Sequence, residues 1–267
     1  GTIIPMFYAP KDFSPAECVY LKNAGKTGKE MFGATLVSLA VKGLLKIEYA
    51  KSRGYAITKL EDNVDNAKHP MNEIEKQFFN RIFLGKDVFK IKKSTYNSML
   101  SIAQDLLNSE IDSKQTNVYY IRNRHLANRN FIMPFIIAVF GGLAFAFMGG
   151  AIAIIIVAFI LSILLNIIYI RLYEQPTKEG RKKMDEIAGF EMYMKYADQN
   201  RIKALNPPTL NFEHFEQNLP YAIALGVAEE WKGKFDIPEL REENFNSHMP
   251  YLVGMSMMNI GNMGSEM

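Results

Sequence analysis

The sequence has very little cysteine and no recognisable catalytic motif. Cys18 is the single cysteine among 267 residues, so the chain cannot form an intramolecular disulfide or a zinc site built from paired cysteines. No Gly-x-Ser-x-Gly or glycine-rich dinucleotide motif is present. The GKTGKE stretch fails the phosphate-loop pattern because Tyr20 stands where that pattern needs its first glycine. The four histidines are scattered along the chain, and we expect no metal and no other cofactor.

Charge is absent from one long stretch in the middle of the chain. Residues 1–130 carry a net charge of +7 and residues 171–267 a net charge of −4, whereas residues 131–170 contain no charged residue. This stretch is about twice the length of roughly 20 apolar residues that one bilayer crossing needs. We predict a transmembrane helical hairpin with helices at 131–148 and 151–170, which would be roughly 27 and 30 Å long. A buried hairpin in a soluble protein is the alternative, but its helices would need a polar face.

Basic residues flank the apolar stretch on both sides, which predicts that both soluble parts lie in the cytoplasm. The chain is thus expected to be a multi-pass protein of the bacterial inner (plasma) membrane. The juxtamembrane basic residues are Arg122, Arg124, Arg129, Arg171, Arg181, Lys182 and Lys183, with Lys178 beside them.

The hairpin helices carry small residues at a spacing of four, which suits close helix packing. Ser162 and Asn166 share a face of the second helix and are candidates for hydrogen bonds across the hairpin. The small residues are Ala138, Gly142, Ala146 and Gly150. No ionisable group lies within the hairpin, so we do not expect transport through the hairpin alone.

The N-terminal part reads as an extended linker followed by a winged-helix-like module. Residues 1–13 begin with Gly rather than Met, and we expect the chain to be the downstream part of a longer protein. In residues 14–62, Ser14-Pro15 with Glu17 is typical of a helix start. A second helix ending at Gly43 and a pair of alternating strands complete the order helix, helix, β-hairpin.

This module is basic, and three readings of that charge stay open. Lysine and arginine could neutralise phosphates of duplex DNA, contact anionic lipid head groups, or lie on the surface of a protein-binding module. The second helix offers Thr35 and Ser38, but no Arg, Asn or Gln for bidentate base contacts. The candidate contacts are Lys29, Lys42, Lys46, Lys51 and Arg53.

Three further regions follow from pattern changes along the chain. Residues 71–125 alternate helix and short strand and could form a second winged-helix-like module. Residues 176–235 read as a helical module, in which LPYAIALGVAEEWKGKF forms one last helix with Pro220 in its first turn. Residues 236–267 are rich in Met, Asn, Gly and Ser and read as a flexible tail. The expected fold class is therefore α+β and mostly α.

An enzyme is the weakest of three functional classes, because it rests only on polar residues that cluster near the end of one predicted helix. That cluster consists of Glu191, Tyr193, Asp198 and Arg201. The favoured hypothesis is a non-enzymatic membrane protein whose modules contact a protein partner or lipid head groups, in anchoring or signal relay. A membrane-tethered DNA-binding regulator is the alternative.

Five stretches together resemble a known family over roughly residues 1–235. They are FSPAECVYL, ATLVSLAVKGLLKIE with YAITKL, the apolar hairpin, AGFEMYMKYADQNR and LPYAIALGVAEEWKGKF. The chain resembles the bacterial predicted membrane proteins grouped as domain of unknown function 2207. The resemblance implies a membrane location and an extracytoplasmic domain with a membrane helix ahead of this region. It implies no activity and no catalytic residues.

Overall fold

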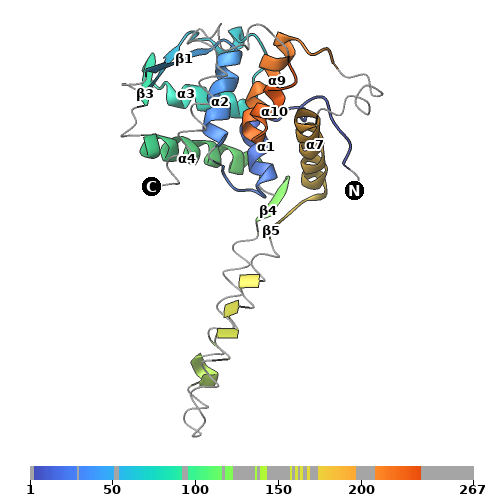
Figure 1. The fold of residues 1–267 in the computed structure, drawn as a ribbon. Coiled ribbons are helices and arrows are strands. Elements are labelled where there is room, and N and C mark those ends of the chain that lie inside the picture. The colour runs from blue at the N-terminus through green and yellow to red at the C-terminus, as the bar shows by residue number, and fades with distance from the viewer. Residues whose placement is uncertain are drawn as a thin grey trace. The chain divides into compact units, whose positions relative to one another are not determined.

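The computed structural model is mostly helical, with small antiparallel sheets (Figure 1). It describes residues 3–28, 30–50, 54–91, 96–115, 118–122, 174–196 and 208–235, with scattered residues between 136 and 168. The chain divides into two compact units. Residues 1–114 and 181–267 form the first, which we call the two-flank domain because it joins sequence from both sides of the apolar segment 131–170. Residues 115–180 form the second unit.

The first two helices begin and end where local sequence signals place them. Helix α1 (Pro15–Lys22) has Ser14 as its N-cap, and Ser14 and Glu17 cap each other's backbone N–H groups, which confirms the predicted helix start. Helix α2 (Glu30–Val41) is followed by Gly43 at a φ of 80°. Glycine suits this position because a Cβ disfavours the left-handed conformation.

A three-stranded antiparallel sheet follows in the order β1-β2-β3. Strands β1 (Leu45–Ala50) and β2 (Gly54–Lys59) form the predicted hairpin, in which Ile47 pairs with Ile57. Strand β3 (Val88–Ile91) was expected in a separate module, but it pairs with β2. The sheet therefore joins the two N-terminal stretches that the sequence pattern separated.

The remaining N-terminal elements are a 3-10 turn (Val64–Asn66), α3 (Glu73–Ile82), α4 (Tyr96–Gln115) and β4 (Tyr120–Arg122). Strand β4 pairs with β5 (Glu174–Pro176), which the sequence pattern did not predict. Since β3 and β4 belong to different sheets, the described part of residues 71–125 does not have a sheet of its own.

The C-terminal part differs from the expected helix boundaries. Helix α7 (Lys178–Lys195) lies within the predicted helical module 176–235, but the predicted last helix was wrong at both ends. Helix α9 (Phe212–Leu225) begins earlier and holds Pro220 in its interior, where Pro220 is buried. Gly226 then ends α9 in the left-handed conformation, and a separate helix α10 (Ala228–Lys232) follows. Burial of the proline-containing face outweighed the tendency of proline to break a helix.

The core of the two-flank domain surrounds α2. Helix α2 packs against α1 and most extensively against α9, which comes from the other side of the apolar segment (Figure 1). Nearly every residue of α2 is buried, including Thr35 and Ser38. A helix that is apolar on all sides needs cover on all sides. Only the joining of both flanks supplies that cover.

Candidate functional site

The two ends of the apolar segment are held together by β4 and β5. Tyr120 pairs with Pro176, and Arg122 pairs with Glu174. The backbone N–H of Thr177 donates to the carbonyl of Tyr119 at 3.0 Å. The chain thus enters and leaves the stretch 123–173 at adjacent positions.

Gly180 allows the backbone to approach closely at this junction. A Cβ at Gly180 would lie 1.8 Å from the carbonyl oxygen of Tyr119, a distance that no side chain tolerates. The hydroxyl of Thr177 donates to the carbonyl of Val118 at 2.7 Å and accepts from the N–H of Gly180 at 3.0 Å. The start of α7 can therefore lie against the residue before β4 because Gly180 has no side chain.

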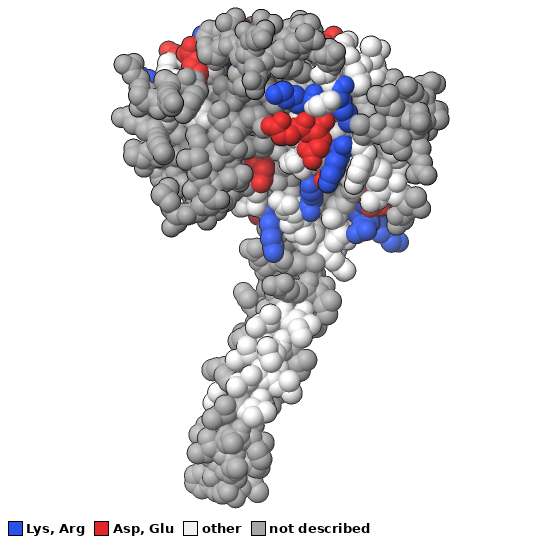
Figure 2. Space-filling view, viewed as in Figure 1, with Lys and Arg blue, Asp and Glu red and all other residues white. Residues whose placement is uncertain are grey.

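The described residues of the apolar segment are helical and expose apolar side chains. Phe140 is 68% exposed and Ile160 is 53% exposed. In Figure 2 the described atoms of this segment are all white, because they include neither acid nor base. Among the residues that the structure describes, no helix combines the length and apolar composition that a membrane crossing needs. The expected helices 131–148 and 151–170 lie largely outside the described residues.

Side chains from both flanks meet inside the two-flank domain. The hydroxyl of Tyr221 in α9 donates to the carbonyl of Phe13 at 2.8 Å. The ammonium of Lys22 in α1 lies 2.9 Å from the carboxylate of Glu191 in α7 and donates to the carbonyl of Leu225 at 3.0 Å. Segments more than two hundred residues apart are thus joined by polar contacts as well as by packing.

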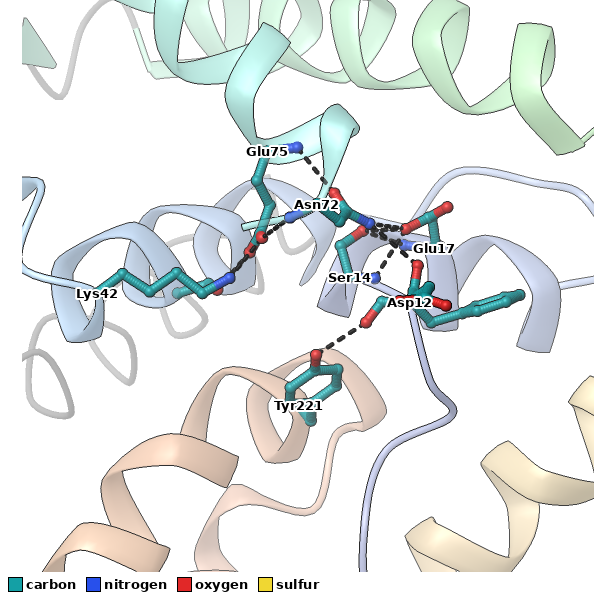
Figure 3. Close-up of polar contacts among 9 residues, drawn as sticks. Asp12, Ser14, Glu17, Lys42, Asn72, Glu75 and Tyr221 are labelled. Carbon is teal, nitrogen blue, oxygen red and sulfur yellow. Dashed lines mark hydrogen bonds and ion pairs between the residues drawn. The ribbon is translucent and has the colours of Figure 1, made fainter. Parts of the chain in front are cut away.

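A buried polar network links three helices at their ends (Figure 3). Asn72 is the N-cap of α3 and forms a capping box with Glu75, just as Ser14 does with Glu17 in α1. The side-chain amide of Asn72 also donates to the carboxylate of Glu17, which joins the two boxes. Each box satisfies the free N–H groups of its own helix, and the shared amide fixes the two helix starts against each other.

Glu75 connects this network to α2. Its carboxylate accepts from the hydroxyl of Ser38 and from the ammonium of Lys42, each at 2.5 Å. The carboxylate of Glu17 lies 3.4 Å from the ammonium of Lys114 in α4. Glu17 and Glu75 are both 1% exposed. Of these two pairs, only that of Glu75 with Lys42 is shielded on both sides, and removing one partner from a buried pair costs about 3–5 kcal/mol.

A second cluster is aromatic and includes three titratable groups. The Tyr193 hydroxyl lies 3.2 Å from Nε2 of His214, and both rings pack edge-on near Trp231. The ammonium of Lys234 lies 4.9 Å from the ring centroid of Tyr193 and donates to the carbonyls of Tyr193 and Tyr196. Burial lowers the pKa of His214, lowers the pKa of Lys234 to about 8, and raises the pKa of Tyr193 to about 12. These contacts anchor the end of α10 to the end of α7.

The predicted basic contacts are only partly on the described surface. Lys42 is 14% exposed because it pairs with Glu75, and Lys46 lies 2.8 Å from Glu48 on the sheet. Lys29, Lys51 and Arg53 lie outside the described residues. On the described part of the face in Figure 2, basic atoms adjoin acidic atoms instead of forming a patch of one sign.

The juxtamembrane residues after the segment are described except for Arg171, and most of those before it are not. Arg181 and Lys182 are exposed, with Arg181 3.5 Å from Asp185, and Lys183 lies 2.7 Å from Glu186. The backbone of Arg122 belongs to β4. Gly142 lies in a helical stretch. The other predicted juxtamembrane and packing residues lie outside the described residues: Arg124, Arg129, Arg171, Ala138, Ala146, Gly150, Ser162 and Asn166.

The polar cluster considered for an enzyme is not assembled among the described residues. Glu191 pairs with Lys22, and Tyr193 is buried in the aromatic cluster. Asp198 and Arg201 lie outside the described residues. Burial raises the pKa of the Cys18 thiol, which makes it a poor nucleophile. The described residues hold no group of three or more His, Cys, Asp or Glu side chains arranged for a metal ion.

Sequence reasoning found one half of the polar network and missed the other. The Ser14–Glu17 box was recognised, but Asn72 and Glu75 were not, although Asn-x-x-Glu at a helix start carries the same signal. Their contacts with Glu17 and Ser38 depend on tertiary packing and could not be found from spacing.

A comparison with protein families finds a match that covers most of the chain. Residues 4–235 match the model described as "Predicted membrane protein (DUF2207) C-terminal domain". The chain belongs to this family. It is therefore a member of a family of predicted membrane proteins, and the family match begins at the segment that leads into α1 and ends after α10. No curated protein and no solved structure matches the chain.

Proposed function

We propose that this DUF2207 domain is a non-enzymatic, membrane-anchored interaction module of the bacterial inner membrane. Residues 131–170 cross the bilayer twice as a helical hairpin, and the two-flank domain lies on the cytoplasmic side. There it contacts a protein partner or anionic lipid head groups and anchors a complex or relays a signal.

The observation that carries this proposal is the joint folding of both flanks. Helix α9, from beyond the apolar segment, covers α1 and α2, which precede it. A domain built in this way requires both flanks to lie on the same side of the membrane. An even number of crossings satisfies this requirement, and residues 131–170 have the length for two. The pairing of β4 with β5 supports the same geometry because it brings the two ends of the segment together.

The side of the membrane follows from charge. Arg181 and Lys182 are exposed near the start of α7, which follows β5 after the segment, and further basic residues precede the segment. Basic residues near the ends of membrane helices favour the cytoplasmic side. This supports a cytoplasmic position for the two-flank domain.

The structure favours contact with protein or lipid over reading of DNA. The order α1, α2, β1, β2 is winged-helix-like, and α2 would be the helix that enters the major groove. However, α2 is buried, Ser38 donates to Glu75, and the hydroxyl of Thr35 donates to the carbonyl of Met31 at 2.7 Å. A tethered DNA-binding regulator would have to rely on the wing between β1 and β2, and this alternative stays a prediction.

Cysteine labelling of the full chain in bacterial spheroplasts tests the proposed topology. Leu84→Cys introduces a thiol before the segment at a residue that is 81% exposed, and Glu230→Cys introduces one after it at another exposed residue. We expect a membrane-impermeant maleimide to label both variants only after lysis. The wild-type chain is the matched control, because its single Cys18 is buried and has a raised pKa. Labelling of either variant in intact spheroplasts would overturn the proposal.

The partner class is tested with the full chain in nanodiscs. Binding of a generic DNA duplex to the chain is measured over a salt series. The same series is run in nanodiscs of neutral lipid and in nanodiscs of anionic lipid. Duplex binding that persists at physiological salt and is lost in the Lys51→Glu, Arg53→Glu double variant would favour the regulator. Absence of duplex binding would support a protein or lipid partner.

A further inference from the structure

We propose that residues 4–13 form a strap whose seating on α7 controls the polar network at the starts of α1 and α3. The strap would make the two-flank domain responsive to movement at its N-terminal end. This coupling lies within the domain, so it would stand even if the membrane topology proposed above failed.

The strap is held on α7 by a glycine. The backbone N–H of Met6 donates to the carbonyl of Gly189 at 3.0 Å. A Cβ at Gly189 would lie 2.2 Å from the carbonyl oxygen of Ile4 and 2.9 Å from Cγ of Met6. Phe7 adds an edge-on contact with Tyr193, with ring centroids 5.0 Å apart. The strap therefore lies against bare helix backbone, and any side chain at Gly189 would displace it.

The strap has an inner and an outer side. Along residues 4–9, Pro5, Phe7 and Ala9 are partly buried, and the residues between them are exposed. This alternation is that of an extended chain lying on a surface. Helix α7 supplies that surface, through Gly189 and Tyr193.

The far end of the strap belongs to the polar network itself. A turn closes where the N–H of Phe13 donates to the carbonyl of Pro10 at 3.2 Å, with Asp12 at a φ of 64°. The carbonyl of Asp12 accepts from the Asn72 amide at 3.4 Å, and the carbonyl of Phe13 accepts from Tyr221. Ser14, the N-cap of α1, follows directly (Figure 3).

A continuous path of contacts therefore runs from α7 to the two capping boxes. Lifting the strap would withdraw the carbonyls of Asp12 and Phe13 from Asn72 and Tyr221. Asn72 would lose its hydrogen bond to Asp12 and keep the one to the carboxylate of Glu17. The backbone that leads into the N-cap Ser14 would no longer be held in place. Helix starts that lose cap contacts fray first, because their N–H groups have no partner within the helix.

The Gly189→Ala variant of the full chain tests this coupling by hydrogen–deuterium exchange. Alanine favours the helix itself, so faster exchange elsewhere cannot be attributed to a weaker α7. We expect exchange to become about tenfold faster at the amides of Met6 and Phe13, whose N–H groups donate in the seated strap, and at the cap amides of Ser14, Asn72 and Glu75. The amides of α2 should keep their wild-type rates.

Gly233→Ala is the matched control. Gly233 has a right-handed helical conformation, and a Cβ there would meet only the carbonyl oxygens of Glu229 and Glu230, at 3.5 and 3.6 Å. These are ordinary contact distances, so its exchange pattern should match the wild type. Faster exchange in the strap without any change in the caps of Gly189→Ala would overturn the coupling. Unchanged exchange in the strap would overturn the seat on α7.

A second variant tests the same path from its other end. Tyr221→Phe removes the hydroxyl that donates to Phe13 and keeps the ring in the core. Exchange at Ser14 and Glu17 should rise about threefold, since one hydrogen bond is lost without loss of packing. Unchanged exchange at both amides would contradict the proposal, whether or not Gly189→Ala folds.

Discussion

The two-flank domain and the apolar segment differ in where they place apolar side chains and in whether they contain charged ones. In the domain, Leu36 and Phe190 are fully buried, and Glu75 is held between Lys42 and Ser38. In the described part of the apolar segment, residues such as Phe140 point outward and no charged residue is present. Water favours the first arrangement and disfavours the second. Water surrounds the domain, and the exposed apolar side chains of the segment are what the proposed membrane hairpin requires.

Removal of Glu75 should break the domain side of this comparison and have the largest effect. Glu75→Ala leaves Lys42 and Ser38 without their carboxylate partner in a buried position. We expect the free energy of unfolding to fall by about 3–5 kcal/mol, measured by urea unfolding. Glu48→Ala is the control, because its pair with Lys46 is partly exposed and should contribute no more than about 1 kcal/mol. An equal decrease in the free energy of unfolding in both variants would contradict a larger contribution from the buried network.

A charge in the apolar segment should break the other side. Ile160→Arg places a cation near the centre of the second expected helix, at a cost of about 2.5–3.5 kcal/mol if the residue lies in lipid. The fraction of the chain that resists alkaline carbonate extraction from membranes should fall. Leu84→Arg, at an exposed apolar residue of the domain, should leave that fraction unchanged. If Ile160→Arg also leaves it unchanged, the segment is not in the bilayer.

The junction of β4 and β5 sharpens the comparison because it holds the ends of the segment. Gly180→Ala would force a Cβ into the carbonyl of Tyr119, and overpacking of this kind costs about 1–3 kcal/mol. Amide exchange in β4 and at Thr177 should become faster, as measured by mass spectrometry. Gly233→Ala serves again as the control. A wild-type exchange rate at Thr177 in Gly180→Ala would mean that the close approach does not hold the junction.

The smallest expected effect is a pH dependence of the domain. Burial lowers the pKa of His214 below its ordinary value of 6.5, so the unfolded chain binds a proton at higher pH than the folded protein does. The free energy of unfolding should therefore decrease as the pH falls below 6.5 and be fully retained above it. Urea unfolding of the wild type and of His214→Gln at several pH values measures this. A slope below that pH that is the same in both proteins would rule out His214 as its source.

Local signals in the sequence were enough for the elements that depend on few residues. The start of α1 at Ser14, the end of α2 before Gly43 and the hairpin of β1 and β2 were all predicted from spacing. The pattern of residues 71–125 likewise predicted a short strand, and β3 lies there. Capping, glycine turns and strand alternation act over a few residues, so they can be read without knowing the fold.

Local sequence signals gave wrong predictions where contacts with distant segments determine the structure. Pro220 indicated a helix start, but packing placed it inside α9. Glu174–Pro176 carries no strand pattern of its own and becomes β5 only because β4 lies beside it. Lys42 counted as a surface cation, although Glu75 withdraws it into the network.

The sequence by itself determined the family, the uncharged apolar segment and most helix positions, because each depends on composition or short-range spacing. Only the tertiary structure decided that the two flanks share one core and that a hydrogen bond joins the two capping boxes. It also decided that the backbones of Tyr119 and Ile4 lie against Gly180 and Gly189. These outcomes depend on which surfaces meet. The apolar surface of α2 had to be covered, and α9 covers it. That packing requirement brought the two flanks of the apolar segment into one domain.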